Sequence, residues 1–185
     1  MPVSKEASVR FVQGMPTGNL PFPFEGGNLV KVEELMTKSP RTCRPDDTLS
    51  QAAQVMWEAD CGAVPVVSSD GEGRVVGIIT DRDVCMAGYT RGMTLAQMRV
   101  REAMTKDLRC CKASDTLAEA EAALRGAQVR RLPVVDESAH LVGLLSLADL
   151  AREAARERGS KRPAISEGEV GDTLASICEP RHVAT

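Results

Sequence analysis

Aromatic residues are scarce in this 185-residue chain: they make up 3% of it, as one Trp, one Tyr and three Phe. Hydrophobic residues still reach 43%, so we expect a core of Val, Leu, Ile, Met and Ala. No apolar run approaches the roughly 18 residues of a membrane span, and residues 1–12 lack an apolar stretch of signal-peptide length. These absences argue against a membrane protein and predict a cytoplasmic location.

Charge bias and catalytic motifs are also missing. The net charge is −3 with no obvious basic face, which argues against nucleic acid as a partner. The chain contains no G-x-S-x-G, Walker lysine or H-E-x-x-H motif, so we predict no enzyme and no catalytic residue.

The six cysteines form no C-x-x-C pair, and neither His140 nor His182 lies near two of them in sequence. We therefore predict no metal site and interpret the cysteines as reduced, mostly buried thiols. The alternative is redox control through Cys43, Cys110 and Cys111.

One sequence pattern occurs twice. An apolar run ends in a hydroxyl residue, and a carboxylate follows three positions later. The two copies differ in length by two residues within a polar turn, which is where true structural repeats vary. The matching blocks are 32–38 with 100–106, 47–49 with 115–117, 65–67 with 133–135, and 76–83 with 142–149.

Each copy is predicted to fold as strand, helix, strand, strand, helix, an α/β unit with a three-stranded sheet. An extended piece at 41–44 opens the first copy, and capping boxes begin the next helix at Thr48 and at Thr116. The last helix of each copy is expected to begin at Thr80 or Ser146. These two helices should end near Gly88 and Arg158. Two such units form a natural facing pair around a pseudo-two-fold axis.

The rest of the chain divides by composition. A Gly- and Pro-rich arm holds Phe11, Phe22 and Phe24, whose rings we expect to pack on the domain or on a partner subunit. A capping box at Ser166 predicts a short helix that stops at Pro180. The predicted parts are an arm at 1–31, a first repeat at 32–90, a second repeat at 91–158 with a linker at 91–99, and a tail at 159–185.

The end of each copy suits a nucleotide. A helix N-terminus presents free N–H groups and a partial positive charge that favour phosphate. Thr80 or Ser146 adds a hydroxyl, and Asp83 or Asp149 can accept hydrogen bonds from ribose hydroxyls. The same pairs are also plausible helix caps that need no ligand. From spacing alone the two interpretations are equal.

With these motifs in both copies, residues 31–158 resemble the CBS domain family, specifically a tandem pair (a Bateman module). The resemblance implies two βαββα repeats packed through their sheets, with two clefts that bind AMP, ADP, ATP or S-adenosylmethionine. It also implies a homodimer and a non-catalytic regulatory role toward an unidentified protein, without a required cofactor. The alternative is a structural dimerisation module with empty clefts.

The resemblance also implies the site residues. It predicts that Arg131, and less strongly Arg130, contacts phosphate, because nucleotide-binding relatives carry a basic pair before this strand. The first copy has no basic residue at the equivalent positions 60–63, so the two clefts are not equivalent. The ring-contacting segments would be Thr42, Cys43, Val64 and Pro65 for one cleft, and Cys110, Cys111, Leu132 and Pro133 for the other.

Overall fold

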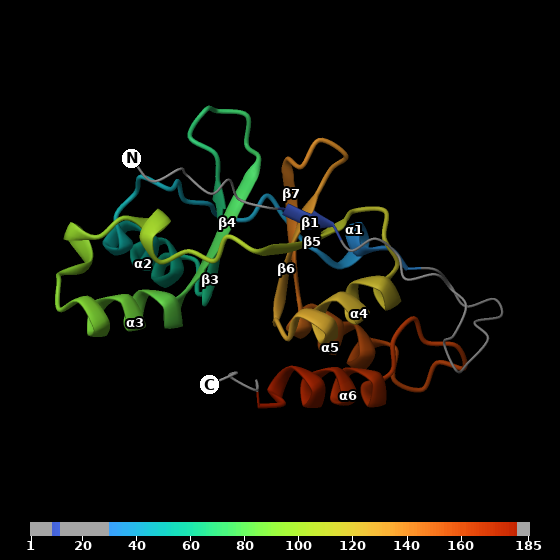
Figure 1. Ribbon diagram of the computed structural model, residues 1–185. Helices are drawn as coiled ribbons and strands as arrows, with labels where there is room; N and C mark the ends of the chain where they lie inside the picture. The colour runs from blue at the N-terminus through green and yellow to red at the C-terminus, as the bar shows by residue number, and fades with distance from the viewer. Residues whose placement is uncertain (1–8, 12–29, 181–185) are drawn as a thin grey trace.

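The computed structural model describes the backbone of residues 9–11 and the whole of residues 30–180 (Figure 1). The rings of Phe11, Phe22 and Phe24, expected to pack on the domain or a partner, lie outside what is described. The first repeat contains α1 (Val32–Leu35), β2 (Thr37–Lys38), α2 (Leu49–Glu58), β3 (Ala63–Val67), β4 (Val75–Thr80) and α3 (Asp81–Arg91). The remainder contains β1 (Val9–Phe11), β5 (Leu108–Lys112), α4 (Leu117–Ala127), β6 (Arg131–Val135), β7 (Leu141–Ser146), α5 (Leu147–Arg156) and α6 (Glu167–Cys178).

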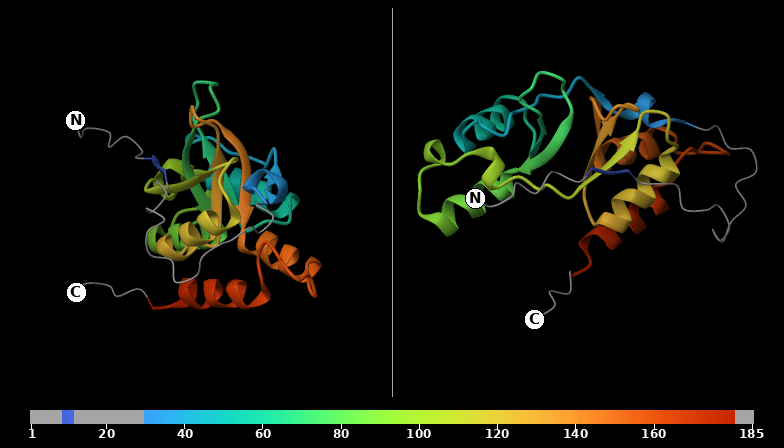
Figure 2. Two further views of the ribbon diagram at one scale, coloured as in Figure 1. Left: turned by 90° about the vertical axis from the view of Figure 1, so that its right-hand side faces the viewer. Right: turned by 45° about the horizontal axis from the view of Figure 1, so that its top comes forward.

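The two repeats face each other through their sheets. Figure 1 shows the hairpins β3–β4 and β6–β7 side by side in the middle, with the helices on the outer sides, and Figure 2 confirms this from a second direction. A small apolar cluster joins them, in which Val75 of the first repeat packs with Leu108, Cys110 and Val135 of the second. The predicted α/β fold of two facing repeats is confirmed.

The two sheets differ in size. In the second repeat β5 pairs in parallel with β6, and β6 pairs antiparallel with β7. The added strands β1 and β2 extend this sheet to five strands in the order β1-β5-β6-β7-β2. In the first repeat the piece at 41–44 is not the third strand we predicted, because only Cys43 bridges to Val66. Prolines at 40 and 45 bracket this piece and cannot donate ladder hydrogen bonds.

The helix starts follow the predicted caps. In each of five helices the side chain of the capping residue accepts a hydrogen bond from the backbone N–H three residues later. The capping residues are Thr48, Thr80, Thr116, Ser146 and Ser166. These contacts are local in sequence, so the pattern alone could predict them.

Two helices end at other residues than the sequence predicts. The helix α3 does not end near Gly88 but runs to Arg91, where Gly92 adopts a left-handed conformation at φ 61° and closes the last turn. The helix α5 ends at Arg156, two residues before the predicted Arg158. The predicted C-terminal helix is confirmed as α6, which ends before Pro180.

The opening segment of each repeat packs against the other repeat. Val32 is fully buried in the core of the second repeat, and its N–H donates to the Asp115 carbonyl at 3.0 Å. In reverse, Val100 is fully buried in the core of the first repeat, and its N–H donates to the Asp47 carbonyl at 2.9 Å. Each core is therefore completed by a segment that belongs to the other repeat in sequence.

A glycine in each sheet leaves room for the opening segment of the other repeat. The side chain of Met104 lies over Gly77 in β4, and the side chain of Met36 lies over Gly143 in β7. A side chain at either glycine would collide with the methionine of the other repeat. These glycines are thus required by close packing rather than by backbone conformation.

Replacing Gly77 with alanine tests the exchange. A Cβ at this position would lie 2.6 Å from Met104 Sδ and 3.2 Å from the Thr105 carbonyl oxygen. We expect the free energy of unfolding, measured by urea denaturation, to fall by about 1–3 kcal/mol, the usual cost of overpacking.

Gly126→Ala in α4 is the matched control. A Cβ there meets nothing within 4 Å, so stability should stay equal or rise by up to about 1 kcal/mol. An equal loss of stability in both variants would contradict the close contact at Gly77.

Candidate functional site

The first candidate corner lies where β4 passes into α3. The Thr80 N–H and hydroxyl both donate to Asp83 Oδ2, at 2.9 and 2.7 Å. The Asp83 N–H returns a hydrogen bond to Thr80 Oγ1 at 3.2 Å. The pair is thus a complete capping box before any ligand is considered.

The second corner, between β7 and α5, has the same geometry. The Ser146 N–H and hydroxyl donate to Asp149 Oδ2 at 2.8 and 2.6 Å, and the Asp149 N–H donates to Ser146 Oγ at 3.3 Å. Asp149 is only 8% exposed, and its Oδ1 pairs with the exposed side chain of Arg152. A ligand that used Oδ1 here would have to displace Arg152.

The exchanged segments run antiparallel to the strands that lead into the corners, so the lysine at the end of each segment lies on the side away from its corner. In the β2–β7 ladder Lys38 lies opposite Gly143, three residues before Ser146. In the other repeat Thr105 bridges to Ile78, two residues before Thr80, and Lys106 follows directly. Sequence reasoning did not select Lys38 or Lys106. The register gives neither lysine a place beside the hydroxyl and carboxylate of its corner.

Arg131 connects the two repeats. Its backbone lies opposite Ser146 in the β6–β7 ladder, beside the second corner. Its guanidinium reaches the first repeat: a Cβ added at Gly62 would lie 3.6 Å from an Arg131 Nη atom and 2.9 Å from Asp81 Oδ2. Since Asp81 directly follows Thr80, this cation extends toward the first corner.

The predicted ring-contacting residues lie along both inner strands. Val64 and Pro65 are buried in β3, next to the register position where Ala63 meets Thr80. Leu132 and Pro133 occupy the equivalent buried positions in β6, and Leu132 pairs with Leu145 beside the second corner. These four apolar residues are therefore close to the corners in the ladders.

The other four predicted residues lie on the far edge of the same inner strands. The Cys43 N–H donates to the Pro65 carbonyl at 3.1 Å, so β3 separates Cys43 and the exposed Thr42 from Thr80. In the second repeat Cys111 pairs with Val134 on the side of β6 away from β7, and Cys110 precedes it in β5. Cys43, Cys110 and Cys111 are buried, and Thr42 alone of the four is exposed.

Burial controls the chemistry of three thiols. Desolvation raises the pKa of Cys43, Cys110 and Cys111 to about 12, with a smaller contribution from Asp47 at Cys43 and from Asp115 at Cys111. The thiolate is the reactive form of cysteine, so these groups are protonated and inert near neutral pH. The structure therefore argues against the redox alternative.

The hollow beside Asp83 is small. Asp83, Arg91 and Glu102 are among the residues that line it, and its volume is about 220 Å³. Ligand pockets usually measure roughly 300–1,000 Å³, so a whole nucleotide needs more room than this hollow offers. Within the described residues no group of three His, Cys, Asp or Glu side chains is placed to hold a metal ion. Among the helices of the described residues, none combines the length and the hydropathy of a membrane span.

Two facing α/β repeats that complete each other's cores define a single module built from two copies of one unit. The chain belongs to the CBS domain family as a tandem pair, because the model of the CBS domain matches residues 32–89 and 100–156.

Two relatives show the range of proteins that carry such a pair. The CBS domain-containing protein YhcV of Bacillus subtilis is 35% identical over 120 residues, which are 65% of this chain and 82% of YhcV. Inosine-5'-monophosphate dehydrogenase of Methanocaldococcus jannaschii is 35% identical over 133 residues, which are 69% of this chain and only 25% of the enzyme. The chain thus matches a part of an enzyme but most of a CBS domain protein.

A solved structure supports the fold. The CBS domain pair of protein MJ0100, in complex with 5'-methylthioadenosine and S-adenosyl-L-methionine, aligns with a TM-score of 0.60 at 22% identity. The alignment covers 68% of this chain and 95% of that one.

Thiol labelling checks the buried state of the cysteines. At about pH 8 we expect a maleimide or disulfide reagent to modify exposed Cys85 and Cys178 rapidly, and Cys43, Cys110 and Cys111 only after unfolding. Mass spectrometry of the peptides identifies each modified site. Fast labelling of any of the three buried thiols in the native protein would restore the redox alternative.

Proposed function

We propose that this module is a non-catalytic sensor that binds an adenosine-containing ligand between its two repeats. The observation that carries the proposal is Arg131, a cation of one repeat whose guanidinium extends to the corner of the other. The complex of MJ0100 supports the ligand class, because that protein has the same fold and binds two adenosine derivatives.

The chemistry of the corners fits such a ligand. The N-termini of α3 and α5 favour phosphate, and Arg131 adds a full positive charge. In the cap Asp83 uses Oδ2, so Oδ1 can accept from ribose hydroxyls while the helix cap stays intact. Apolar walls for the purine ring would come from Val64, Pro65, Leu132 and Pro133. Because the hollow beside Asp83 is too small for a whole nucleotide, the proposal requires the repeats to separate slightly when the ligand binds.

The exchange of opening segments gives the ligand a way to signal. A ligand in one cleft contacts both repeats, so it favours the relative orientation that it binds best. We propose that a regulated protein reads this orientation, and that the module works in the cytoplasm as a homodimer. AMP, ADP, ATP and S-adenosylmethionine all present the required ribose and adenine.

A structural module with empty clefts is the competing function. It is favoured by one observation: both corners are complete capping boxes, so each carboxylate already has a role in stability. The two functions differ in a single measurable property, the response of stability to nucleotide.

Thermal unfolding with AMP, ADP, ATP and S-adenosylmethionine measures that response. A ligand at about 100 times its dissociation constant stabilises by about 2.7 kcal/mol, which raises Tm by roughly 5–10 °C for a chain of this size. Asp83→Ala or Asp149→Ala should abolish the rise if its corner is occupied.

Glu119→Ala is the matched control, because it removes an equivalent capping box at Thr116 on α4. All three variants should lose about 1 kcal/mol of stability, but the control should keep the full ligand response. If no ligand shifts the wild-type Tm, the clefts are not adenosine sites and the structural function holds.

Arg131→Ala separates phosphate binding from ring binding. Loss of a hydrogen bond to a charged group costs about 1.5–3 kcal/mol, so we expect AMP or ATP to bind roughly 10–100 times more weakly. Adenosine itself should bind almost unchanged, and titration calorimetry measures both. Arg156→Ala, an exposed arginine paired with Glu153 on α5, is the control. Equal losses for nucleotide and adenosine would contradict a phosphate contact.

A further inference from the structure

The two copies carry different charges around their corners. The block before the first inner strand, 60–63, contains one acid and no base, whereas the equivalent block 128–131 contains two arginines. The residue after the corner hydroxyl also differs, because it is Asp81 in the first repeat and Leu147 in the second. The first repeat thus places acids around its corner where the second places bases and an apolar residue.

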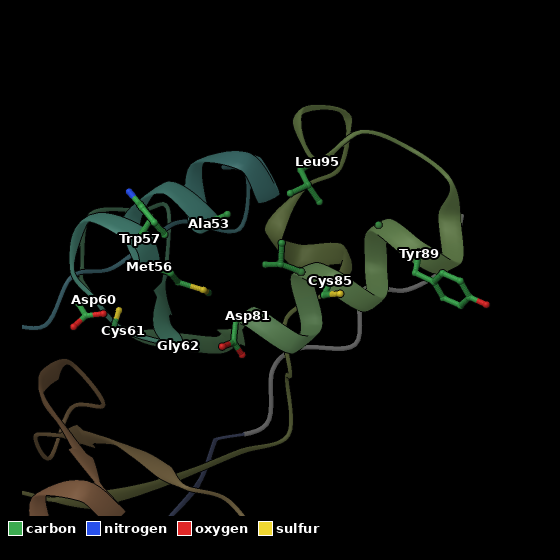
Figure 3. A pocket seen from close by; sticks show the side chains of 12 residues that line it. Ala53, Met56, Trp57, Asp60, Cys61, Gly62, Asp81, Cys85, Tyr89 and Leu95 are labelled. Atoms are coloured by element: carbon green, nitrogen blue, oxygen red, sulfur yellow. The ribbon is translucent and has the colours of Figure 1, made fainter.

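Asp81 is the first residue of α3 and lies beside Gly62. Its N–H donates to the Gly62 carbonyl at 3.2 Å, and its Oδ1 accepts the Arg82 N–H at 2.7 Å. Both Asp81 and Gly62 line a hollow of about 680 Å³ between α2 and α3, and Figure 3 shows them side by side at its edge. The Asp81 side chain is exposed, so its carboxylate can meet a ligand that approaches the corner.

The second carboxylate oxygen of Asp81 faces a cation of the other repeat. The position of a Cβ at Gly62 is 2.9 Å from Asp81 Oδ2 and 3.6 Å from an Arg131 Nη atom. Within the described residues the Arg131 guanidinium forms no hydrogen bond or ion pair with another side chain. The carboxylate and the guanidinium therefore flank one space without closing it by direct contact.

The helix itself does not require an acid at this position. An acidic residue in the first turn stabilises a helix through the helix dipole, which is the ordinary role of such a residue. In α3 the capping box is already complete with Asp83. In α5 the same box forms with Leu147 at the position of Asp81. The scaffold thus begins this helix equally well without the Asp81 carboxylate.

The position of Asp81 affects the charge of any ligand that reaches Arg131. A phosphate that enters the space beside Gly62 is attracted by the guanidinium and repelled by the Asp81 carboxylate. Arg131 and Asp81 together carry no net charge. A ligand with one phosphate can gain the Arg131 contact, but each additional phosphate increases the repulsion from Asp81.

We propose that Asp81 determines ligand charge at the first corner, so that this corner takes adenosine or AMP and rejects polyphosphates such as ATP. The inference rests on the proposed sensor function, which names adenosine-containing ligands without choosing among them. The second corner has Leu147 in place of Asp81 and lacks this restriction. The two corners therefore select different ligands.

Asp81→Asn tests the selectivity, because the amide removes the charge but keeps an oxygen that can accept the Arg82 N–H. Titration calorimetry in an Asp149→Ala background, which disables the second corner, compares adenosine, AMP and magnesium-free ATP. With Asp81 present, AMP should bind about 10-fold more tightly than ATP. Asp81→Asn should leave adenosine within about 2-fold, strengthen AMP about 5-fold and strengthen ATP about 30-fold, so that the preference for AMP is largely lost.

Asp70→Asn is the matched control. This exposed carboxylate lies in the turn before β4, at the opposite end of that strand from Thr80, and it pairs with Arg74. Its removal should leave the three affinities unchanged. Because the proposed effect of Asp81 is electrostatic, the gain from Asp81→Asn should shrink when salt rises from about 0.05 to 0.5 M. A role confined to the start of α3 would instead alter Tm and change the three affinities equally.

A second variant, Asp81→Leu, introduces the residue that α5 has at this position and should give the same loss of preference. An unchanged ratio of ATP to AMP affinity in both Asp81 variants would overturn the selectivity role and leave the sensor function intact. Failure of the unsubstituted chain to bind adenosine, AMP or ATP would overturn the sensor function and this inference with it. The two failures are therefore distinguishable.

Discussion

The exchange of opening segments is the contact on which the rest of the module depends. Val32 and Val100 are fully buried, but each completes the core of the repeat to which it does not belong in sequence. Neither repeat can bury its own apolar surface alone, so the two must fold and move as coupled halves. Gly77 and Gly143 make the exchange possible, because a side chain at either would block the methionine of the other repeat. In the proposed sensor function, the same coupling would let a ligand in one cleft alter the whole module.

The corners show how one set of hydrogen bonds can serve two purposes. A carboxylate that caps a helix through one oxygen keeps a second oxygen for other partners. At Asp83 the cap uses Oδ2, while at Asp149 Arg152 already occupies Oδ1. The two corners are thus alike in backbone and different in electrostatics. This difference in electrostatics distinguishes the two candidate sites, whereas their shared motif does not.

Local features of the fold could be predicted from the sequence, and long-range ones could not. The caps at Thr80 and Ser146 involve residues three apart, so the motif contains all the partners. These motifs do not predict which repeat an opening segment packs against. Each repeat has a glycine, Gly77 or Gly143, over which the methionine of such a segment can lie. The resemblance predicts a phosphate contact for Arg131, but the reach of its guanidinium to the other repeat depends on tertiary geometry. The missing third strand at 41–44 is different, because the prolines at 40 and 45 that limit its pairing with β3 to Cys43 are visible in the sequence.

One difference between the two copies lies where the repeats meet. Gly62 of the first repeat corresponds to Arg130 of the second, and its missing side chain leaves the space that the Arg131 guanidinium and Asp81 share. The φ of Gly62 is not in the left-handed region, so this glycine is required by space and not by backbone conformation. Arg131 in the second copy and Gly62 in the first are therefore complementary, because the guanidinium occupies space that a side chain at position 62 would fill. A duplicated fold with identical halves would offer two equal clefts. The residues that differ here instead direct charge toward one corner.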